Sequence, residues 1–166
     1  MEEDQLVEKE KVTVRNAEIS DYESVSILEE MEYQLHRKAR PDYFKNLEKS
    51  YAREDFEELL SLPCPIALVA VLNERIIGIC FGKVEMTPEN EVCKPRRVAF
   101  IQDLVVLPEF RGKGVAGHLM KKVRELAVKE GAVGMELCVW NFNEGALRFY
   151  ERMGMKVQYL RMEEEL

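Results

Sequence analysis

Short stretches of hydrophobic residues predict six β-strands in this chain. Residues 11–17 (KVTVRNA) alternate between apolar and polar positions, as a half-buried strand does. Residues 65–72 (PIALVAVL) are continuously apolar, and residues 75–86 follow Asn73 and Glu74 as the second strand of a predicted hairpin. Three more stretches with strand character lie at residues 97–106, 133–140 and 155–163.

A longer helical period predicts the first helix. Ser20 followed by Glu23 has the pattern of a capping box, so we expect a helix to begin there. It should end near Arg37, because Arg40 precedes Pro41 and the residue before a proline is disfavoured in helices. Its predicted apolar face consists of Val25, Leu28, Met31 and Leu35.

Further helices are predicted on either side of the later strands. One or two short helices are expected within residues 42–50 and 53–62. A longer helix should run from Val115 and be capped by Gly131, and a last one should open at Asn141 with Glu144 and close at Gly154. The order of strands and helices predicts an α/β fold, a mixed sheet with helices on both faces.

Length and composition limit what this fold can be. A chain of 166 residues, 46% of them hydrophobic, can bury one substantial core. We therefore expect an acidic N-terminal tail over residues 1–10 and a single domain over residues 11–166. The net charge of −7 argues against a nucleic-acid partner or an acidic membrane surface.

Cysteine usage and hydropathy predict a cytoplasmic protein. The four cysteines form no C-x-x-C pair, so we expect reduced thiols rather than disulfides or metal ligands; they are Cys64, Cys80, Cys93 and Cys138. No apolar run is long enough to span a bilayer, and the first ten residues are acidic where a secretory signal would be basic and then apolar.

A glycine triplet suggests a phosphate site. Gly112, Gly114 and Gly117 have the G-x-G-x-x-G spacing of a dinucleotide-binding turn. That turn belongs in the first βα unit of its fold, whereas this one lies two thirds along the chain. The nearest suitable acid, Glu136, falls in the middle of the next predicted strand rather than at its end. The Walker pattern also fails, because no Ser or Thr follows a Gly-Lys pair.

An arginine in front of the glycines favours another phosphate ligand. Arg111, Gly114 and Ala116 form an R-x-x-G-x-A pattern at the mouth of a predicted helix. The unpaired N–H groups of a helix start, the helix dipole and small residues together suit a pyrophosphate. Lys113 adds a second positive charge. The alternative is that the glycines only form a tight turn between strand and helix.

Two blocks of the sequence resemble the GNAT superfamily of acetyl-CoA-dependent N-acetyltransferases. The first, DLVVLPEFRGKGVAGHLM, matches the family's [Q/R]-x-x-G-x-[G/A] segment after the fourth strand. The second, VWNFNEGALRFYERMGMK, resembles the family's Asn, Ala, Tyr and Gly segment through Asn143, Ala146, Tyr150 and Gly154. By element order the resemblance covers residues 11–162. It implies a GNAT-type fold whose fourth and fifth strands splay apart, with acetyl-CoA as co-substrate and no metal.

The resemblance also implies roles for individual residues. Backbone groups of Leu104, Val105 and Val106 would pair with the pantetheine arm, and Asn143 would bond its amide. The alternative for Asn143 is a helix cap. The pyrophosphate would be held by Arg111, Gly112, Lys113, Gly114, Val115, Ala116 and Gly117.

Amine acetylation requires a base and an acid. A protonated amine must lose a proton before it attacks the thioester, and the departing thiolate must gain one. Tyr150 shares a predicted helix face with Asn143, and the resemblance assigns it the acid. The glutamate used as base in one branch of the family is replaced here by Cys138, so we expect Asp103 to serve, with Glu136 or a water relay as alternatives. A backbone N–H near Leu104 or Val105 would meet the oxyanion.

The acceptor is less constrained by the sequence. Residues 35–44 include His36, Arg37, Arg40, Tyr43 and Phe44, which either line an acceptor pocket or form an ordinary helix end. Several acidic residues are better explained as solvated helix faces than as attraction for a cationic amine: Glu29, Glu30, Glu32, Asp55, Glu57 and Glu58. We expect a small-molecule amine acceptor. Protein N-termini or lysines, a non-catalytic acyl-CoA sensor and homodimerisation stay open.

Overall fold

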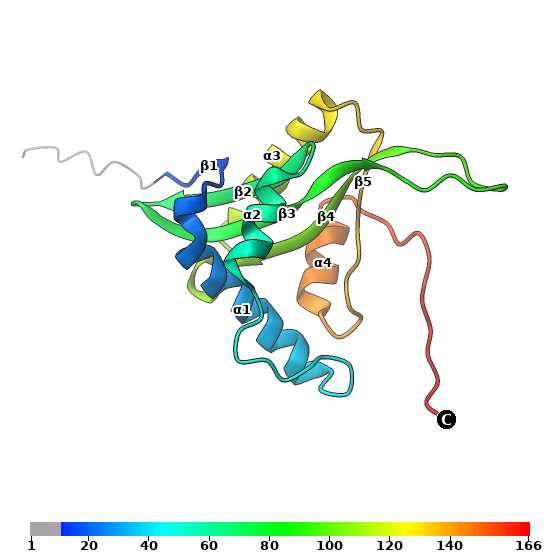
Figure 1. Ribbon diagram of the computed structural model, residues 1–166, viewed down its shortest axis with the longest axis horizontal. Helices are drawn as coiled ribbons and strands as arrows, with labels where there is room; N and C mark the ends of the chain where they lie inside the picture. The colour runs from blue at the N-terminus through cyan, green and yellow to red at the C-terminus, as the bar shows by residue number, and fades with distance from the viewer. Residues whose placement is uncertain (1–10) are drawn as a thin grey trace, which may run out of the picture.

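The computed structural model describes residues 11–166, which form a sheet with its strands in chain order (Figure 1). The strands are β1 (Thr13–Asn16), β2 (Pro65–Leu72), β3 (Arg75–Met86), β4 (Arg97–Val106) and β5 (Gly134–Leu137). The first four pair antiparallel, and β5 runs parallel to β4. The predicted mixed, mostly antiparallel sheet is confirmed. The predicted acidic tail, residues 1–10, lies outside the described residues.

Helices cover both faces of the sheet, as predicted (Figure 1). On one face α1 (Tyr22–Ala39) contacts β3 and β4, and α2 (Arg53–Ser61) contacts β2. On the other face α3 (Val115–Lys129) contacts all five strands. The remaining helical segments are η1 (Ile19–Asp21), η2 (Pro108–Phe110) and α4 (Glu144–Arg152). Because β2 and residues 76–82 of β3 are buried on both faces, these sequences are continuously apolar rather than alternating.

The predicted hairpin between β2 and β3 is confirmed. Leu72 pairs with Arg75, and the two residues between them, Asn73 and Glu74, have φ values of 48° and 61°. Two successive positive φ values are typical of the tight turn that suits the twist of a two-residue hairpin. The turn therefore forms without the glycine that usually favours it.

A bulge in β4 changes the direction of the side chains beyond it. Asp103 pairs with Phe81 and Ile101 pairs with Gly82, so Gln102 is an extra residue without a partner in the β3 register. A Cβ atom on Gly82 would lie 2.1 Å from the carbonyl oxygen of Phe100, so glycine is required opposite the bulge. A bulge breaks the alternation of a strand, and this one therefore determines where Asp103 points.

The fourth and fifth strands separate, as predicted. They pair only from Val98 with Gly134 to Ile101 with Leu137. Beyond Leu137 the chain leaves the sheet, so β5 is shorter than the predicted strand over residues 133–140, while β4 continues to Val106. Beyond Ile101 the backbone of β4 therefore has no strand partner on the side that faces β5.

The sixth predicted strand is wrong. Residues 155–166 form no regular element and lead away from the sheet (Figure 1). Met155 packs partly buried against the core, but the apolar side chains farther along are exposed, among them Tyr159 at 75% and Leu160 at 78%. Near the end of the chain, Glu163 accepts a hydrogen bond of 2.7 Å from Arg40.

Three predictions about helices are also corrected. Residues 42–50 contain turns but no helix. The predicted capping box at Ser20 and Glu23 is not formed. A capping box forms two residues earlier, between Glu18 and Asp21, where the carboxylate of Asp21 accepts from the Glu18 N–H at 2.8 Å. The last helix opens at Asn143 rather than Asn141. The predicted helix ends at Gly131 and Gly154 are confirmed, since their φ values are +73° and +87°.

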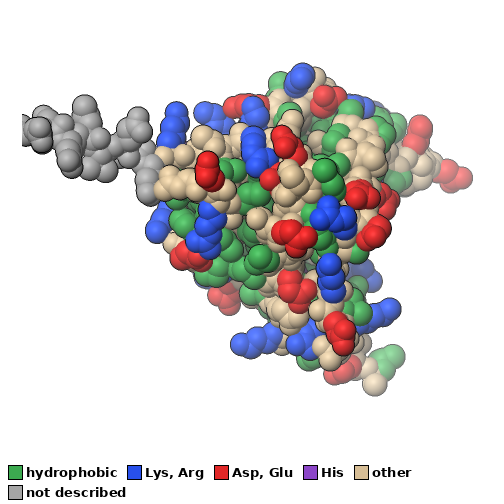
Figure 2. Space-filling view, turned by 60° about the vertical axis from the view of Figure 1, so that its left-hand side comes forward, with side chains coloured by type: hydrophobic (Ala, Val, Ile, Leu, Met, Phe, Trp, Pro, Cys, Tyr) green, Lys and Arg blue, Asp and Glu red, His purple; other side chains and the backbone are tan. Residues whose placement is uncertain are grey.

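The surface carries charges of both signs. Figure 2 shows Lys and Arg side chains interspersed with Asp and Glu over one face of the molecule, where neither sign forms a continuous patch. Among residues 11–166, no helix is both long and apolar enough to cross a membrane.

Candidate functional site

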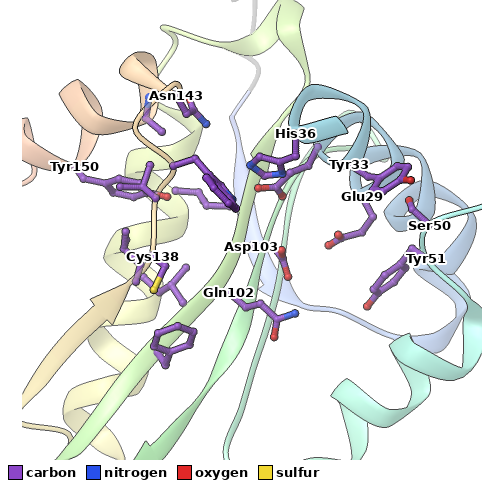
Figure 3. Close-up of a pocket in the computed structure, with 18 residues that line it drawn as sticks. Glu29, Tyr33, His36, Ser50, Tyr51, Gln102, Asp103, Cys138, Asn143 and Tyr150 are labelled. Atoms are coloured by element: carbon purple, nitrogen blue, oxygen red, sulfur yellow. Dashed lines mark hydrogen bonds between the residues drawn. The ribbon is translucent and has the colours of Figure 1, made fainter. Parts of the chain in front are cut away.

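A cleft of about 420 Å³ opens where β4 and β5 separate. Figure 3 shows Tyr150 and Asn143 on one side, Glu29 and His36 on the other, and Asp103 between them. The wall is built from α1, from Ser50 and Tyr51, from the bulge of β4, from the end of β5 with the loop after it, and from α4. Residues distant in the sequence thus meet at the unpaired edge of β4.

The first turn of α3 follows β4 and offers unpaired backbone donors. Gly114 is the N-cap with a φ of +84°, and no side chain caps the helix there. The His118 N–H bonds to the Gly114 carbonyl at 3.0 Å, so the N–H groups of residues 115–117 precede the first intrahelical bond. Gly112 has a φ of +73°, so the turn before α3 requires glycine at both residue 112 and residue 114. The turn leaves the N-terminus of α3 uncapped.

Gly117 lies beside open space. A Cβ atom there would have nothing within 4 Å. Arg111 is exposed, and its Nε donates to the Val106 carbonyl at 3.0 Å. The Val106 carbonyl is therefore already engaged, while the arginine head remains beside the turn. Lys113 lies with its Nζ 5.5 Å from the centroid of the Phe110 ring.

Three carboxyl groups converge in the cleft. One oxygen each from Glu29, Glu32 and Asp103 lies within 4.8 Å of the others. Glu29 is only 8% exposed, and its Oε1 has no hydrogen-bond partner among the described residues; the same holds for Oε2 of Glu32. Figure 3 shows the Glu29 carboxyl pointing from α1 toward Asp103 on β4. We call these three residues the carboxyl trio.

Burial gives the carboxyl trio unequal proton affinities. Burial, followed by the charges of Asp103 and Glu32, raises the pKa of Glu29 to about 9. Burial and the charge of Asp103 raise the pKa of Glu32 to about 8. Burial raises the pKa of Asp103 to about 6. At neutral pH Asp103 is therefore the ionised member, which is the state that a general base needs.

Tyr150 keeps its proton at neutral pH. Burial is the main cause that raises its pKa above the usual range, and nearby Cys80, Glu32 and Asp103 add to it. Figure 3 shows its hydroxyl pointing into the cleft. A phenol held in its protonated form is suited to donate a proton to a group bound in the cleft.

Asn143 serves as a helix cap. Its Oδ1 accepts from the Ala146 N–H at 3.2 Å at the start of α4. This is the alternative that the sequence left open, and it leaves the Nδ2 amide as the group that can bond a ligand. Cys138, at the position of the family's glutamate, is exposed and lines the same cleft.

The structure brings some predicted site residues together and leaves others apart. Asp103, Leu104, Asn143 and Tyr150 line the cleft. Glu136 does not; its Oε1 lies 3.4 Å from Nη1 of Arg96, and this removes it as a candidate base. The side chains of Val105, Val106 and Val115 are buried, so these residues can offer only backbone groups.

The aromatic end of the cleft contains one of the predicted acceptor residues. His36 lines the cleft, and its ring stacks on Phe44 with 5.5 Å between centroids. Burial lowers the pKa of His36, so the ring is neutral at pH 7. Arg37 instead donates to Asn46 at 2.8 Å, and Arg40 pairs with Asp42 at 2.7 Å.

The sequence reasoning missed several residues of the cleft. The sequence favours a solvated helix face for Glu29 and Glu32, whereas the structure places both in the cleft together with Tyr33, Ser50 and Tyr51. A signal was present, because residues 25, 28, 29, 32 and 36 follow helical spacing and continue one buried stripe from apolar into polar residues. Acidic residues on an inward helix face indicate a site rather than a surface.

The comparisons with known proteins identify the family. The model of the acetyltransferase (GNAT) family matches residues 32–155, which span both halves of the cleft. The chain belongs to this family. Its GNAT fold is also that of a tetramutant of the BH1408 protein from Bacillus halodurans, with a TM-score of 0.88 and 28% identity over 93% of this chain and 99% of that one.

Two curated relatives are longer than this GNAT chain. An uncharacterized N-acetyltransferase of Methanocaldococcus jannaschii is 30% identical over 87% of this chain and 60% of its own length. A mycothiol acetyltransferase of Brachybacterium faecium is 36% identical over 63% of this chain and 31% of its own length. The chain thus spans less than two thirds of either relative.

Proposed function

We propose that this GNAT domain transfers an acetyl group from acetyl-CoA to the primary amine of a small molecule by direct attack on the thioester. One observation carries the proposal: Asp103 and Tyr150 line one cleft, at the edge where β4 loses its partner strand. Asp103 on the strand is an ionised carboxylate, which suits removal of a proton from the amine. Tyr150 across the cleft is a protonated phenol, which suits donation of a proton to the leaving thiolate.

The cofactor would bind along β4 and across the start of α3. The backbone N–H and C=O of Leu104, which have no strand partner, would pair with the amides of the pantetheine arm, much as an added strand would. The uncapped N–H groups at residues 115–117 would receive the pyrophosphate, together with the charges of Arg111 and Lys113. The Nδ2 group of Asn143 would donate to a carbonyl of the arm.

The proposed reaction removes two protons from the acceptor nitrogen and gives one proton to the leaving sulfur. Asp103 removes the first proton from the bound ammonium, and the freed nitrogen attacks the carbonyl carbon of the thioester. The new N–C bond forms, the C–S bond breaks, the sulfur leaves as a thiolate, and the nitrogen releases its second proton to solvent. Tyr150 protonates the thiolate and is reprotonated from solvent, and Asp103 gives up its proton to solvent. A backbone N–H near Leu104 or Val105 would stabilise the oxyanion formed on the way.

The cleft favours a small acceptor over a protein. Helix α1, Tyr51 and α4 enclose it, and a recessed cleft suits a compact amine better than a folded surface. The name of the mycothiol acetyltransferase among the relatives refers to a small molecule, which agrees with a small acceptor. Transfer to protein N-termini or lysines is the second candidate, and a non-catalytic acyl-CoA sensor is the third.

The test combines binding with a panel of acceptors. Acetyl-CoA at a hundredfold excess over its Kd should stabilise the protein by about 2.7 kcal/mol, measured as a rise in Tm. Release of CoA is then followed with polyamines, aminoglycosides and peptides. We expect transfer to small amines. Transfer confined to peptides would support the second candidate, tight binding without any transfer would support the third, and absence of binding would contradict all three.

A further inference from the structure

The carboxyl trio is larger than proton removal requires. Asp103 alone can accept the amine proton, yet Glu29 and Glu32 on α1 direct two more carboxyl groups at it. Oε1 of Glu29 is fully buried and has no hydrogen-bond partner among the described residues. Buried carboxyl groups without partners destabilise a fold, so a set of them facing a cleft points to a ligand that supplies the missing donors.

The spacing of the trio fits a primary ammonium group. Such a group has three N–H donors in tetrahedral directions. Charge-assisted bonds of roughly 2.7–2.9 Å along these directions place the three acceptor oxygens roughly 4.4–4.7 Å apart. The oxygens of Glu29, Glu32 and Asp103 lie within 4.8 Å of one another. No pair of these oxygens is therefore too far apart for one ammonium nitrogen to contact all three carboxyl groups.

The other residues that line the cleft determine which charges a ligand can carry there. Of the eighteen residues that line the cleft, none is a lysine or an arginine, and its histidine, His36, has a lowered pKa. No cation in this lining could neutralise a carboxylate or phosphate on the acceptor. Such a group beside the amine would face Asp103 and would raise the energy of the complex by like-charge repulsion.

We propose that Glu29, Glu32 and Asp103 form the acceptor-binding subsite, which takes the primary ammonium group of an alkylamine that carries no carboxylate or phosphate beside its amine. This inference rests on the proposed acetyl transfer and names its acceptor class. It gives Glu29 and Glu32 a binding role, and leaves proton removal to Asp103.

The titratable groups around the trio make acceptor binding depend on pH. Asp103 faces Glu29 and Glu32 from α1, and Tyr51, Cys80 of β3 and Tyr150 of α4 lie near enough for their pKa values to be raised by its charge. Every one of these groups is neutral or negative. A bound ammonium therefore lowers the pKa of Glu29 and Glu32, and binding should release protons at pH 7–8.

The experiment uses two acceptors that differ in one charge. Norvalinamide and norvaline have the same shape, but norvaline carries a carboxylate beside its amine. Their kcat/KM values are measured at pH 8.5 for the wild type and for the double variant Glu29→Gln/Glu32→Gln, which keeps Asp103. For each protein, the kcat/KM for norvalinamide is divided by the kcat/KM for norvaline. Comparing this ratio between the wild type and the double variant cancels the intrinsic reactivity of each amine.

We expect the wild type to prefer norvalinamide by roughly tenfold or more, because norvaline brings a second negative charge to the trio. In the double variant this preference should fall by roughly threefold or more, with a higher KM for norvalinamide and an unchanged KM for acetyl-CoA. The control Glu23→Gln/Glu57→Gln removes two exposed carboxylates from α1 and α2 and should behave as the wild type. A Tm measurement on each variant verifies folding.

Two results would overturn the inference. One is an equal preference for the two acceptors in the wild type and the double variant. The other is stabilisation of the wild type, but not of the double variant, by Mg²⁺ or Ca²⁺ with no effect of norvalinamide, which would make the trio a metal site. If no amine is acetylated, the proposed function fails separately, and calorimetric binding of norvalinamide with desulfo-CoA present then decides the subsite.

Discussion

Gly82 on β3 lies so close to Phe100 on β4 that a Cβ atom at residue 82 would be 2.1 Å from the Phe100 carbonyl oxygen. This contact occurs at the β4 bulge, where Ile101 pairs with Gly82 and Gln102 is the extra residue. Beyond the bulge, Asp103 lies beside Glu29 and Glu32 of α1. A backbone contact on β3 thus controls the direction of the proposed base on β4.

Gly82→Ala should therefore affect both stability and activity. The added methyl group must push two strands apart, and we expect the free energy of unfolding to fall by about 1–3 kcal/mol, measured by urea denaturation. Acetyl transfer should fall as well, because Asp103 moves with the bulge. The control Gly145→Ala lies in α4, where the nearest atom to a Cβ is 4.0 Å away. It should be neutral or stabilising; a similar loss in both variants would contradict the role of the bulge.

Tyr150→Phe should lower turnover and leave cofactor binding intact. The change removes the hydroxyl that points into the cleft and keeps the ring. Loss of a general acid reduces kcat by about 10²-fold or more, whereas the Kd for CoA should change little. Tyr159→Phe in the exposed tail is the matched control. Unchanged kcat in Tyr150→Phe would remove this residue from the mechanism.

The sheet could largely be predicted because apolar runs report burial directly. Residues 65–72 and 76–82 are largely buried on both faces, and their continuous apolar sequences predict the two central strands. The alternating residues 155–163 predicted a strand by the same reasoning and failed. Alternation shows that a segment fits a sheet edge, but it does not supply a partner strand, and in the described structure this segment has none.

The helical stripe that contains Glu29 and Glu32 is visible in the sequence, but the sequence alone does not select it, because α1 has a second, more apolar stripe beside it. The apolar choice placed Leu35 inward, yet Leu35 is 45% exposed while Glu29 is buried. Near the cleft, the residues of α1 that face inward are acidic residues of the site rather than apolar residues of the core. A single sequence ranks acidic residues as solvated, and only the position of α1 over β4 shows that they face Asp103.

Gly117→Leu should separate cofactor affinity from stability. The position has open space where a Cβ would lie, so the free protein should keep its Tm or gain slightly from the higher helix propensity of leucine. A leucine side chain at the start of α3 would occupy the space beside the unpaired N–H groups, and we expect the Kd for CoA to rise by about tenfold. Glu125→Leu, exposed on the same helix, is the control. Unchanged affinity would place the pyrophosphate elsewhere.

Glu29→Gln should stabilise the protein increasingly as the pH rises. A carboxyl whose pKa is higher in the folded chain, here about 9, holds its proton through folding. The contribution of Glu29 to the free energy of unfolding is complete below the pKa of the unfolded chain, about 4.3. It is lost as the pH rises toward the pKa of the folded chain. The variant carries no such loss. Unfolding free energies from urea titrations at pH 6, 7.5 and 9 should therefore diverge, by at most about 1.4 kcal/mol per pH unit.

The exposed Glu23 provides the comparison for this pH series. Its side chain is 83% exposed, so Glu23→Gln should show a constant difference from the wild type across the range. Parallel curves for Glu29→Gln would mean that Glu29 ionises at its ordinary pKa in the folded protein, and would contradict the burial of its charge.

Cys138 should be protected from alkylation by the bound cofactor. It is exposed and lines the cleft at the end of β5, where the pantetheine arm would pass. Cys93 is also exposed, but it lies in the loop between β3 and β4 that extends away from the sheet (Figure 1). The rate of iodoacetamide labelling at each cysteine is measured by mass spectrometry with and without desulfo-CoA, which has no thiol of its own. We expect slower labelling at Cys138 alone, because the arm covers its sulfur. Equal rates at Cys138 with and without the cofactor would show that the arm does not run between β4 and β5.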